Sequence, residues 1–175
     1  MRPIPHPIPY QGSKRLLATA ILRHFPADVR LLIEPFAGSA AVTLAAASRS
    51  KTREFLFGDV LQPLVSIWEM ILDAPERLAD EYEILWKQQV GRSREHFLAV
   101  RERFNQTDDP VCLLYLLARC VKNAVRFNSN GQFNQSADHR RKGMNPDKMR
   151  RNILGASELL QGRARVECGD YRDFT

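Results

Sequence analysis

The chain has 175 residues, a length that fits one folded domain with room for a small insertion. Hydrophobic residues make up 44% and charged residues 26%, values that exclude wholesale disorder. No apolar run reaches the roughly 18 residues of a membrane span, and the N-terminus lacks the apolar region of a secretory signal. Three scattered cysteines suggest neither disulfides nor a metal site. We therefore expect a cytoplasmic protein without a membrane partner.

The net charge of +6 is concentrated in one segment of the chain. From Arg119 to Arg151 nine basic residues are opposed by two acidic ones, so this segment carries +7 and the remainder −1. A localised basic patch is typical of proteins that bind nucleic acid. On charge alone, a solvated basic face is about equally well supported.

The first half of the chain has the pattern of a βαβ unit, in which an apolar strand enters a glycine-containing loop and a helix follows. Pro26 is expected to end the first helix, and Ser39 is expected to cap the second one. The predicted elements are an extended segment over 1–9, a helix over 16–22, a strand over 31–34, a helix over 40–47, a strand over 54–59 and a helix over 64–71.

The second half begins with apolar residues at helical spacing over 74–120. A polar stretch over 123–143 predicts a long loop or hairpin, a length that usually serves a function. A basic helix over 144–160 and a third strand over 165–171 follow. The expected parts are therefore a first α/β part over 1–73, a helical and loop insertion over 74–152, and a return to the sheet over 153–175.

Three features are expected at the carboxyl ends of the strands, where open α/β sheets bind ligands. The loop after the first strand contains Gly38, which lets the backbone approach a ligand closely. Asp59 ends the second strand and could accept ribose hydroxyls, while Asp170 could accept from an adenine amine. Each has a simpler alternative, such as a helix cap or a turn, but together they favour a nucleoside site. A single glycine in the loop does not support a dinucleotide site.

Five segments of the chain carry a resemblance to a known family. They are Tyr10-Gln11-Gly12-Ser13-Lys14, Ile33-Glu34-Pro35-Phe36-Ala37-Gly38-Ser39, Phe57-Gly58-Asp59, Lys122-Asn123-Ala124-Val125-Arg126-Phe127-Asn128 and Gly131-Gln132-Phe133-Asn134. In this order and spacing they resemble the Dam-like DNA adenine methyltransferases, which use S-adenosylmethionine to methylate the exocyclic amine of adenine. The resemblance covers essentially the whole chain and implies a partial Rossmann-like methyltransferase sheet, in the α/β class, with a helical DNA-recognition insertion.

The resemblance assigns a set of residues to S-adenosylmethionine. Lys14 would lie near the carboxylate of the cofactor, and Asp170 with Tyr171 would bracket its adenine. Without the resemblance, Lys14 would be interpreted as a solvated lysine and Tyr10 as a packing aromatic. The cofactor residues implied are Tyr10, Lys14, Glu34, Pro35, Phe36, Ala37, Gly38, Asp59, Val60, Asp170 and Tyr171.

A second set is assigned to double-stranded DNA. Arg126 is the best candidate for a bidentate contact to guanine, whereas most of the other cations would contact phosphate. For Asn128 and Asn130, contact with DNA and stabilisation of a turn are equally well supported. The segment 135–138 departs from the family pattern, which puts the base specificity in doubt. The DNA residues implied are Lys122, Asn123, Arg126, Asn128, Asn134, Arg140, Arg141 and Lys142, with Arg150 and Arg151 as further phosphate contacts.

The catalytic Asp-Pro-Pro-Tyr motif of the family does not occur in the sequence, so no catalytic residue is assigned. The strand that carries it in the family would lie beside residues 31–34, which we therefore expect to form an exposed apolar edge. One hypothesis is that a second polypeptide supplies this strand and completes a split enzyme, and the alternative is a truncated fragment. A non-catalytic nucleic-acid-binding module and a methyltransferase acting on RNA or a small molecule are the other functions considered.

Overall fold

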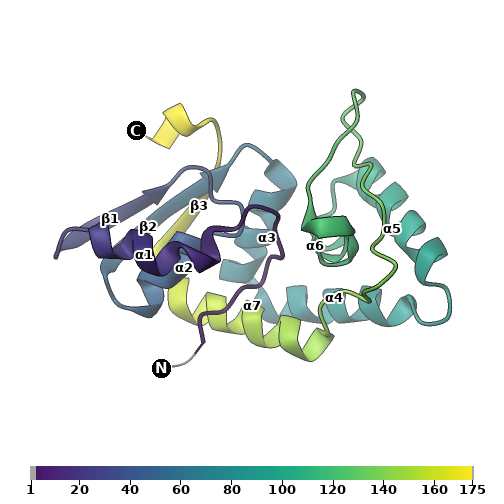
Figure 1. The fold of residues 1–175 in the computed structure, drawn as a ribbon, viewed down its shortest axis with the longest axis horizontal. Coiled ribbons are helices and arrows are strands. Elements are labelled where there is room, and N and C mark those ends of the chain that lie inside the picture. The colour runs from purple at the N-terminus through teal and green to yellow at the C-terminus, as the bar shows by residue number, and fades with distance from the viewer. Residues whose placement is uncertain (1–2, 175) are drawn as a thin grey trace.

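The computed structural model describes residues 3–174. Outside the described residues lie Met1 and Arg2 of the predicted extended segment 1–9 and Thr175 of the predicted part 153–175. A parallel sheet with its helices forms one half of the molecule, and a helical lobe forms the other (Figure 1). The strands are β1 (Val29–Glu34), β2 (Thr52–Asp59) and β3 (Ala164–Cys168), in that spatial order. The helices are α1 (Ala18–Ile21), α2 (Ala41–Ser48), α3 (Gln62–Asp73), α4 (Pro75–Gln88), α5 (Ser93–Thr107), α6 (Pro110–Arg119) and α7 (Pro146–Leu160).

Among the described residues, α2, α3 and α7 lie on one face of the sheet, and the 3₁₀ turn η4 (Tyr171–Phe174) packs Phe174 against Gly58 on the other face. Helices α2, α3 and α7 pack together, and the inward side chains Phe55 and Phe57 of β2 are fully buried in the core. The side chains of Leu31 and Ile33 on β1 point to the opposite face, and each is 40% exposed. Within the described residues β1 pairs with β2 alone, so the predicted apolar edge is confirmed.

The structure corrects two predictions about the first half of the chain. The helix expected over 16–22 is broken into the 3₁₀ turns η1 (Lys14–Leu16) and η2 (Leu22–His24) around the short α1, and Leu16 and Leu17 are exposed. Helical spacing overstated the amphipathicity here, because only Ala18 and Leu22 of this segment are buried. Ser39 does not cap α2, since Ala40 occupies the cap position.

The helical lobe contains α4, α5 and α6, as the periodicity predicts, and supports the predicted hairpin. Antiparallel bridges join Cys120 to Ala137 and Phe127 to Phe133. Asn105 on α5 accepts from the Phe133 amide at 2.8 Å and donates to the Phe133 carbonyl at 3.2 Å. These two bonds fix one hairpin strand to the lobe.

Two segments connect the halves of the molecule. The N-terminal segment lies along α7, where the amide of His6 donates to Asn152 Oδ1 at 3.0 Å, and then reaches the hairpin base, where the Gln11 amide donates to the Asn123 carbonyl at 2.9 Å. Helix α7 packs on both the sheet helices and α4. No helix among residues 3–174 has the length and apolarity to cross a membrane.

Candidate functional site

The loop after β1 is tied to the end of β2 by Asp59. The Gly38 amide donates to Asp59 Oδ2 at 3.1 Å, and the Leu61 amide donates to Oδ1 at 3.2 Å. The Ala37 amide also donates to the Gly58 carbonyl at 2.8 Å. Because a carboxylate has about four acceptor positions, Asp59 still has acceptor capacity for a ligand. The structure therefore brings Asp59 and the glycine loop together, as the sequence predicts.

Left-handed backbone shapes this loop. Gly38 has φ of 49° and Ala40 has φ of 45°, and the Ala40 amide closes a tight turn onto the Ala37 carbonyl. A Cβ at position 38 would lie 3.2 Å from the Tyr10 ring, so the ring covers the glycine closely. Burial raises the pKa of Tyr10, and the nearby Asp59 charge raises it further. Tyr10 is therefore a neutral packing wall of the loop.

Glu34 lies beneath the loop and stabilises the start of α2. Its Oε2 accepts from the Thr43 amide at 2.8 Å and from Thr43 Oγ1 at 2.6 Å. Burial raises the pKa of Glu34, while the bonds from Thr43 act in the opposite direction. The carboxylate thus provides the cap predicted for Ser39, whose hydroxyl instead donates to Ser13 Oγ at 2.7 Å.

Two exposed aromatic rings lie at the same edge of the sheet. Phe36 is 72% exposed and Tyr171 48%, and their ring centroids are 5.5 Å apart. Val60, also predicted, is exposed beyond Asp59. Asp170 accepts from the Arg172 side chain at 2.7 Å, and this bond lowers the pKa of Asp170. Exposed apolar rings at a polar loop can stack on a planar ligand.

The predicted lysine of the cofactor set points back to its own turn. Lys14 Nζ donates to the Gly12 carbonyl at 3.0 Å, and the side chain is exposed. Pro35 lies in the loop between Glu34 and Phe36 and is half-buried. The structure does not bring Lys14 into contact with Asp59 or the aromatic pair.

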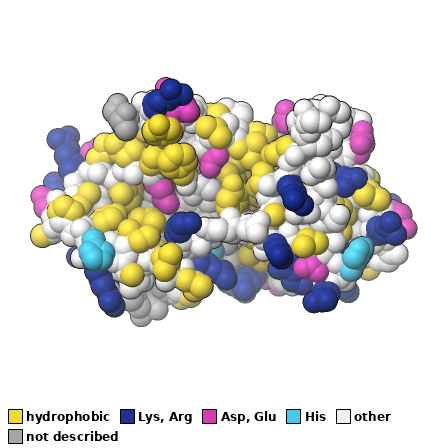
Figure 2. Space-filling view, turned by 45° about the horizontal axis from the view of Figure 1, so that its top comes forward, with side chains coloured by type: hydrophobic (Ala, Val, Ile, Leu, Met, Phe, Trp, Pro, Cys, Tyr) yellow, Lys and Arg dark blue, Asp and Glu magenta, His cyan; other side chains and the backbone are white. Residues whose placement is uncertain are grey.

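The hairpin presents four exposed cations: Lys122, Arg126, Arg140 and Lys142. None of them has an ion pair within the described part of the chain. Arg141 is also exposed but bonds Asp138 at 2.8 Å. Figure 2 shows apolar side chains gathered over the sheet half and Lys and Arg side chains scattered over both halves. The hairpin side therefore offers positive charge to a polyanion.

Two of the nine basic residues are not available to a ligand, which corrects the interpretation of the segment as one exposed patch. Arg119 is 2% exposed and donates to the carbonyls of Asp138 and Arg141 and to Ser93 Oγ. Arg150, a predicted phosphate contact, binds instead three carboxylates of α4. These are Glu76 at 2.8 Å, Asp80, and Glu83 at 3.4 Å.

The asparagines of the hairpin mainly shape its backbone. Asn123 Nδ2 donates to the Leu117 carbonyl at 2.7 Å, at the end of α6. Asn128 Oδ1 accepts from the amides of Asn130 and Gln132 at 3.0 and 2.9 Å, which is the turn chemistry considered beside DNA contact. Asn134 is exposed, and its amide donates to the Arg126 carbonyl at 3.0 Å.

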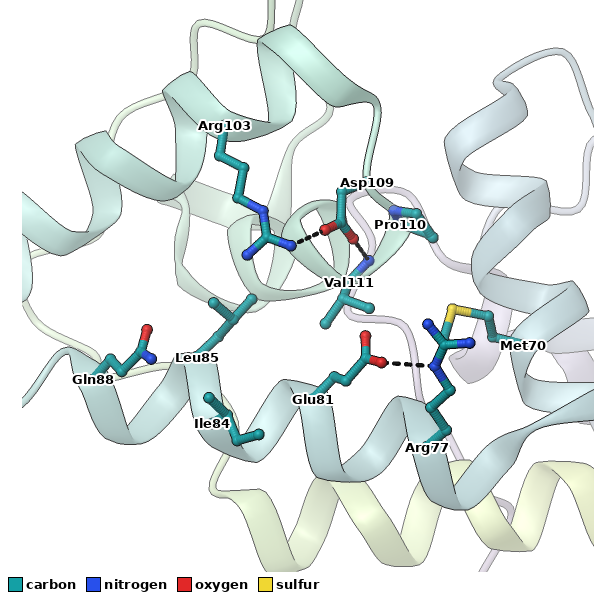
Figure 3. A pocket seen from close by; sticks show the side chains of 10 residues that line it. All are labelled: Met70, Arg77, Glu81, Ile84, Leu85, Gln88, Arg103, Asp109, Pro110 and Val111. Atoms are coloured by element: carbon teal, nitrogen blue, oxygen red, sulfur yellow. Dashed lines mark hydrogen bonds and ion pairs between the residues drawn. The ribbon is translucent and has the colours of Figure 1, made fainter.

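A hollow of about 480 Å³ lies between α3, α4, α5 and α6, away from both predicted sites (Figure 3). The charged side chains that line the hollow are paired, because Arg77 bonds Glu81 at 2.7 Å and Arg103 bonds Asp109 at 2.5 Å. Asp109 also caps α6, because its Oδ1 accepts from the Val111 amide at 2.8 Å. No predicted site residue lines this hollow.

Comparisons with known proteins match the chain to one family and to several curated relatives. The family described as D12 class N6 adenine-specific DNA methyltransferase matches residues 10–175. A DNA adenine methylase of Vibrio cholerae is 28% identical over 129 residues, which are 71% of this chain and 44% of that protein. The type II methyltransferase M.FokI of Planomicrobium okeanokoites is 23% identical over 98% of this chain and 26% of its own length. The chain thus spans less than half the length of these curated relatives.

Proposed function

The chain belongs to the D12 class family of N6 adenine-specific DNA methyltransferases, and from this premise we propose that it is the cofactor-binding and DNA-reading portion of such an enzyme. The observation that carries the proposal is the loop at the carboxyl end of the sheet, where Asp59 holds Gly38 and keeps free acceptor positions beside exposed aromatic rings. This arrangement fits a nucleoside bearing a ribose and a planar base.

The residues present fit S-adenosylmethionine, which when bound supplies an activated methyl group. Asp59 would accept hydrogen bonds from the ribose hydroxyls at the acceptor positions left by Gly38 and Leu61. Phe36 or Tyr171 would stack on the adenine, and Asp170 would accept from its amine. Because the loop backbone is already fixed by hydrogen bonds, binding would cost little ordering entropy.

The exposed hairpin cations would bind double-stranded DNA. Lys122, Arg140 and Lys142 would contact phosphates, giving salt-dependent affinity without sequence choice. Arg126 would contact a guanine edge, the commonest specific base contact. Asn134 and Arg141 would be secondary contacts, and Asn123 and Asn128 would act by shaping the hairpin. The target adenine would leave the base stack to reach the methyl group.

The transfer step needs the Asp-Pro-Pro-Tyr element, which we propose is supplied by a second polypeptide that pairs with β1. The support is that β1 pairs with β2 alone among residues 3–174, which leaves its other side open to a further strand. Leu31 and Ile33, on the sheet face away from α2, α3 and α7, are also 40% exposed. Native mass spectrometry of the chain with the product of the adjoining reading frame tests this. A one-to-one complex is expected, whereas DNA methylation by this chain alone would contradict it.

Calorimetry with S-adenosylmethionine tests the cofactor site. Asp59→Ala removes the proposed ribose acceptor and one anchor of Gly38, so we expect binding to weaken at least about tenfold. Asp73→Ala, at the exposed end of α3, is the matched control and should bind as wild type does. Equal affinity of the two variants would place the cofactor elsewhere or exclude it.

A further inference from the structure

Helix α3 contacts the loop between β1 and α2 (residues 35–40), here called the cofactor loop, through a buried indole. Trp68 is 1% exposed, and its Nε1–H donates to the Gly38 carbonyl at 3.0 Å across 30 residues of sequence. Its ring packs edge-to-face on Phe57 of β2, with centroids 5.2 Å apart. The side chain therefore spans from the centre of the core to the backbone of the loop.

The two peptide groups that flank Gly38 are held from different elements. The amide on its N-terminal side donates to Asp59 at the end of β2, and the carbonyl on its C-terminal side accepts from Trp68 on α3. The Tyr10 ring closes the position where a side chain would be. Gly38 has φ of 49°, a backbone conformation that residues other than glycine rarely adopt. The contacts with Asp59, Trp68 and Tyr10 maintain this conformation.

We propose that Trp68 is a positioning residue for the cofactor loop, acting through its indole N–H on the Gly38 carbonyl. The inference rests on the proposed function, because the loop matters only if it binds S-adenosylmethionine. The core needs an apolar ring at this position, and phenylalanine would serve that need. Only the hydrogen bond requires an indole. Without the indole N–H the buried Gly38 carbonyl would have no donor, so the peptide between residues 38 and 39 would lose its fixed orientation.

The sequence provides a natural control, because it contains only two tryptophans. Trp86 lies on α4, in the other half of the molecule, and its buried indole nitrogen has no partner within residues 3–174. Trp86→Phe therefore removes an indole that makes no hydrogen bond, whereas Trp68→Phe removes one that does. Each variant also leaves a single tryptophan, whose emission reports on one half of the protein.

The test measures calorimetric affinity for S-adenosylmethionine and tryptophan emission on the same proteins, with folding checked by circular dichroism. We expect Trp86→Phe to bind like wild type and its remaining Trp68 to change emission when the cofactor is added. Trp68→Phe should bind about five- to tenfold more weakly, as expected for one hydrogen bond, and Trp86 should not respond.

A purely structural role would give a different result. Trp68→Phe would then unfold at lower urea but bind the cofactor with wild-type affinity when folded, and Trp68 emission would not respond in Trp86→Phe. Either finding overturns the inference. If Trp68→Phe does not fold, the emission of Trp68 in Trp86→Phe decides. If wild type and Trp86→Phe both fail to bind the cofactor, the proposed function is wrong and the inference falls with it.

Discussion

The cofactor loop and the hairpin use their polar groups in opposite ways. In the loop, Asp59, Glu34 and Trp68 form hydrogen bonds to the protein's own backbone or hydroxyls, and these bonds fix the shape of the loop. In the hairpin, Asn105 and Arg119 hold the backbone, and four exposed cations, Lys122, Arg126, Arg140 and Lys142, have no ion pair among residues 3–174. The loop would therefore recognise its proposed cofactor by preorganised geometry, and the hairpin would recognise DNA by its available charge.

This difference explains why charge counting alone misleads in the basic segment. Arg119 and Arg140 both contribute one positive charge to the sequence, yet one is buried as a clamp and the other is exposed. A buried guanidinium that bonds carbonyls stabilises a loop but cannot approach phosphate. Residues that hold a region in place should therefore affect stability, whereas residues that present charge at the surface should affect binding.

The largest effect is expected at Arg119. Arg119→Met leaves the carbonyls of Asp138 and Arg141 without their donor and should lower the free energy of unfolding by about 3 kcal/mol, measured in urea. Arg140→Met should change stability by less than about 0.5 kcal/mol but reduce the salt dependence of duplex-DNA binding by about one unit of log–log slope. Similar stability losses in both variants would contradict the distinction.

A smaller effect is expected at Gly58, where the end of β2 touches the C-terminal segment. A Cβ there would lie 2.2 Å from the Phe174 ring and 2.3 Å from the Glu167 carbonyl. Gly58→Ala should therefore destabilise the sheet by about 2 kcal/mol through overpacking. Gly155→Ala inside α7 meets only Pro5 at 3.4 Å and should stabilise by about 0.5 kcal/mol. The two opposite shifts in urea midpoint test this contrast, and a shift of the same sign would refute it.

The smallest effect concerns His96 in the helical lobe. Burial is the main cause that lowers its pKa, and its Nε2 has no partner within the described residues. A histidine whose folded pKa lies below 6.5 costs stability as the pH falls below 6.5, because the unfolded chain then binds the proton more readily.

His96→Phe keeps the ring packed on Tyr115 and should reduce the acid loss of unfolding free energy between pH 6.5 and 5. His6 is half-buried, and its partial burial also lowers its pKa, so some loss should persist. His139→Phe on the exposed hairpin is the control, and urea unfolding at each pH is the measurement. A variant His96→Phe with the wild-type acid profile would show that His96 is not the titrating group.

The sequence by itself determined the three strands, the helical region after the second strand and the position of Asp59 beside the glycine loop, and it left the polar stretch as either a long loop or a hairpin. These follow from apolar periodicity, from turn residues and from the rule that parallel strands end at one edge of the sheet. The tertiary structure decided what each polar group contacts. Glu34, and not Ser39, caps α2. Trp68 donates to the Gly38 carbonyl across 30 residues of sequence, and Arg119 is buried. Such contacts depend on side-chain directions between elements distant in sequence, which local patterns do not contain.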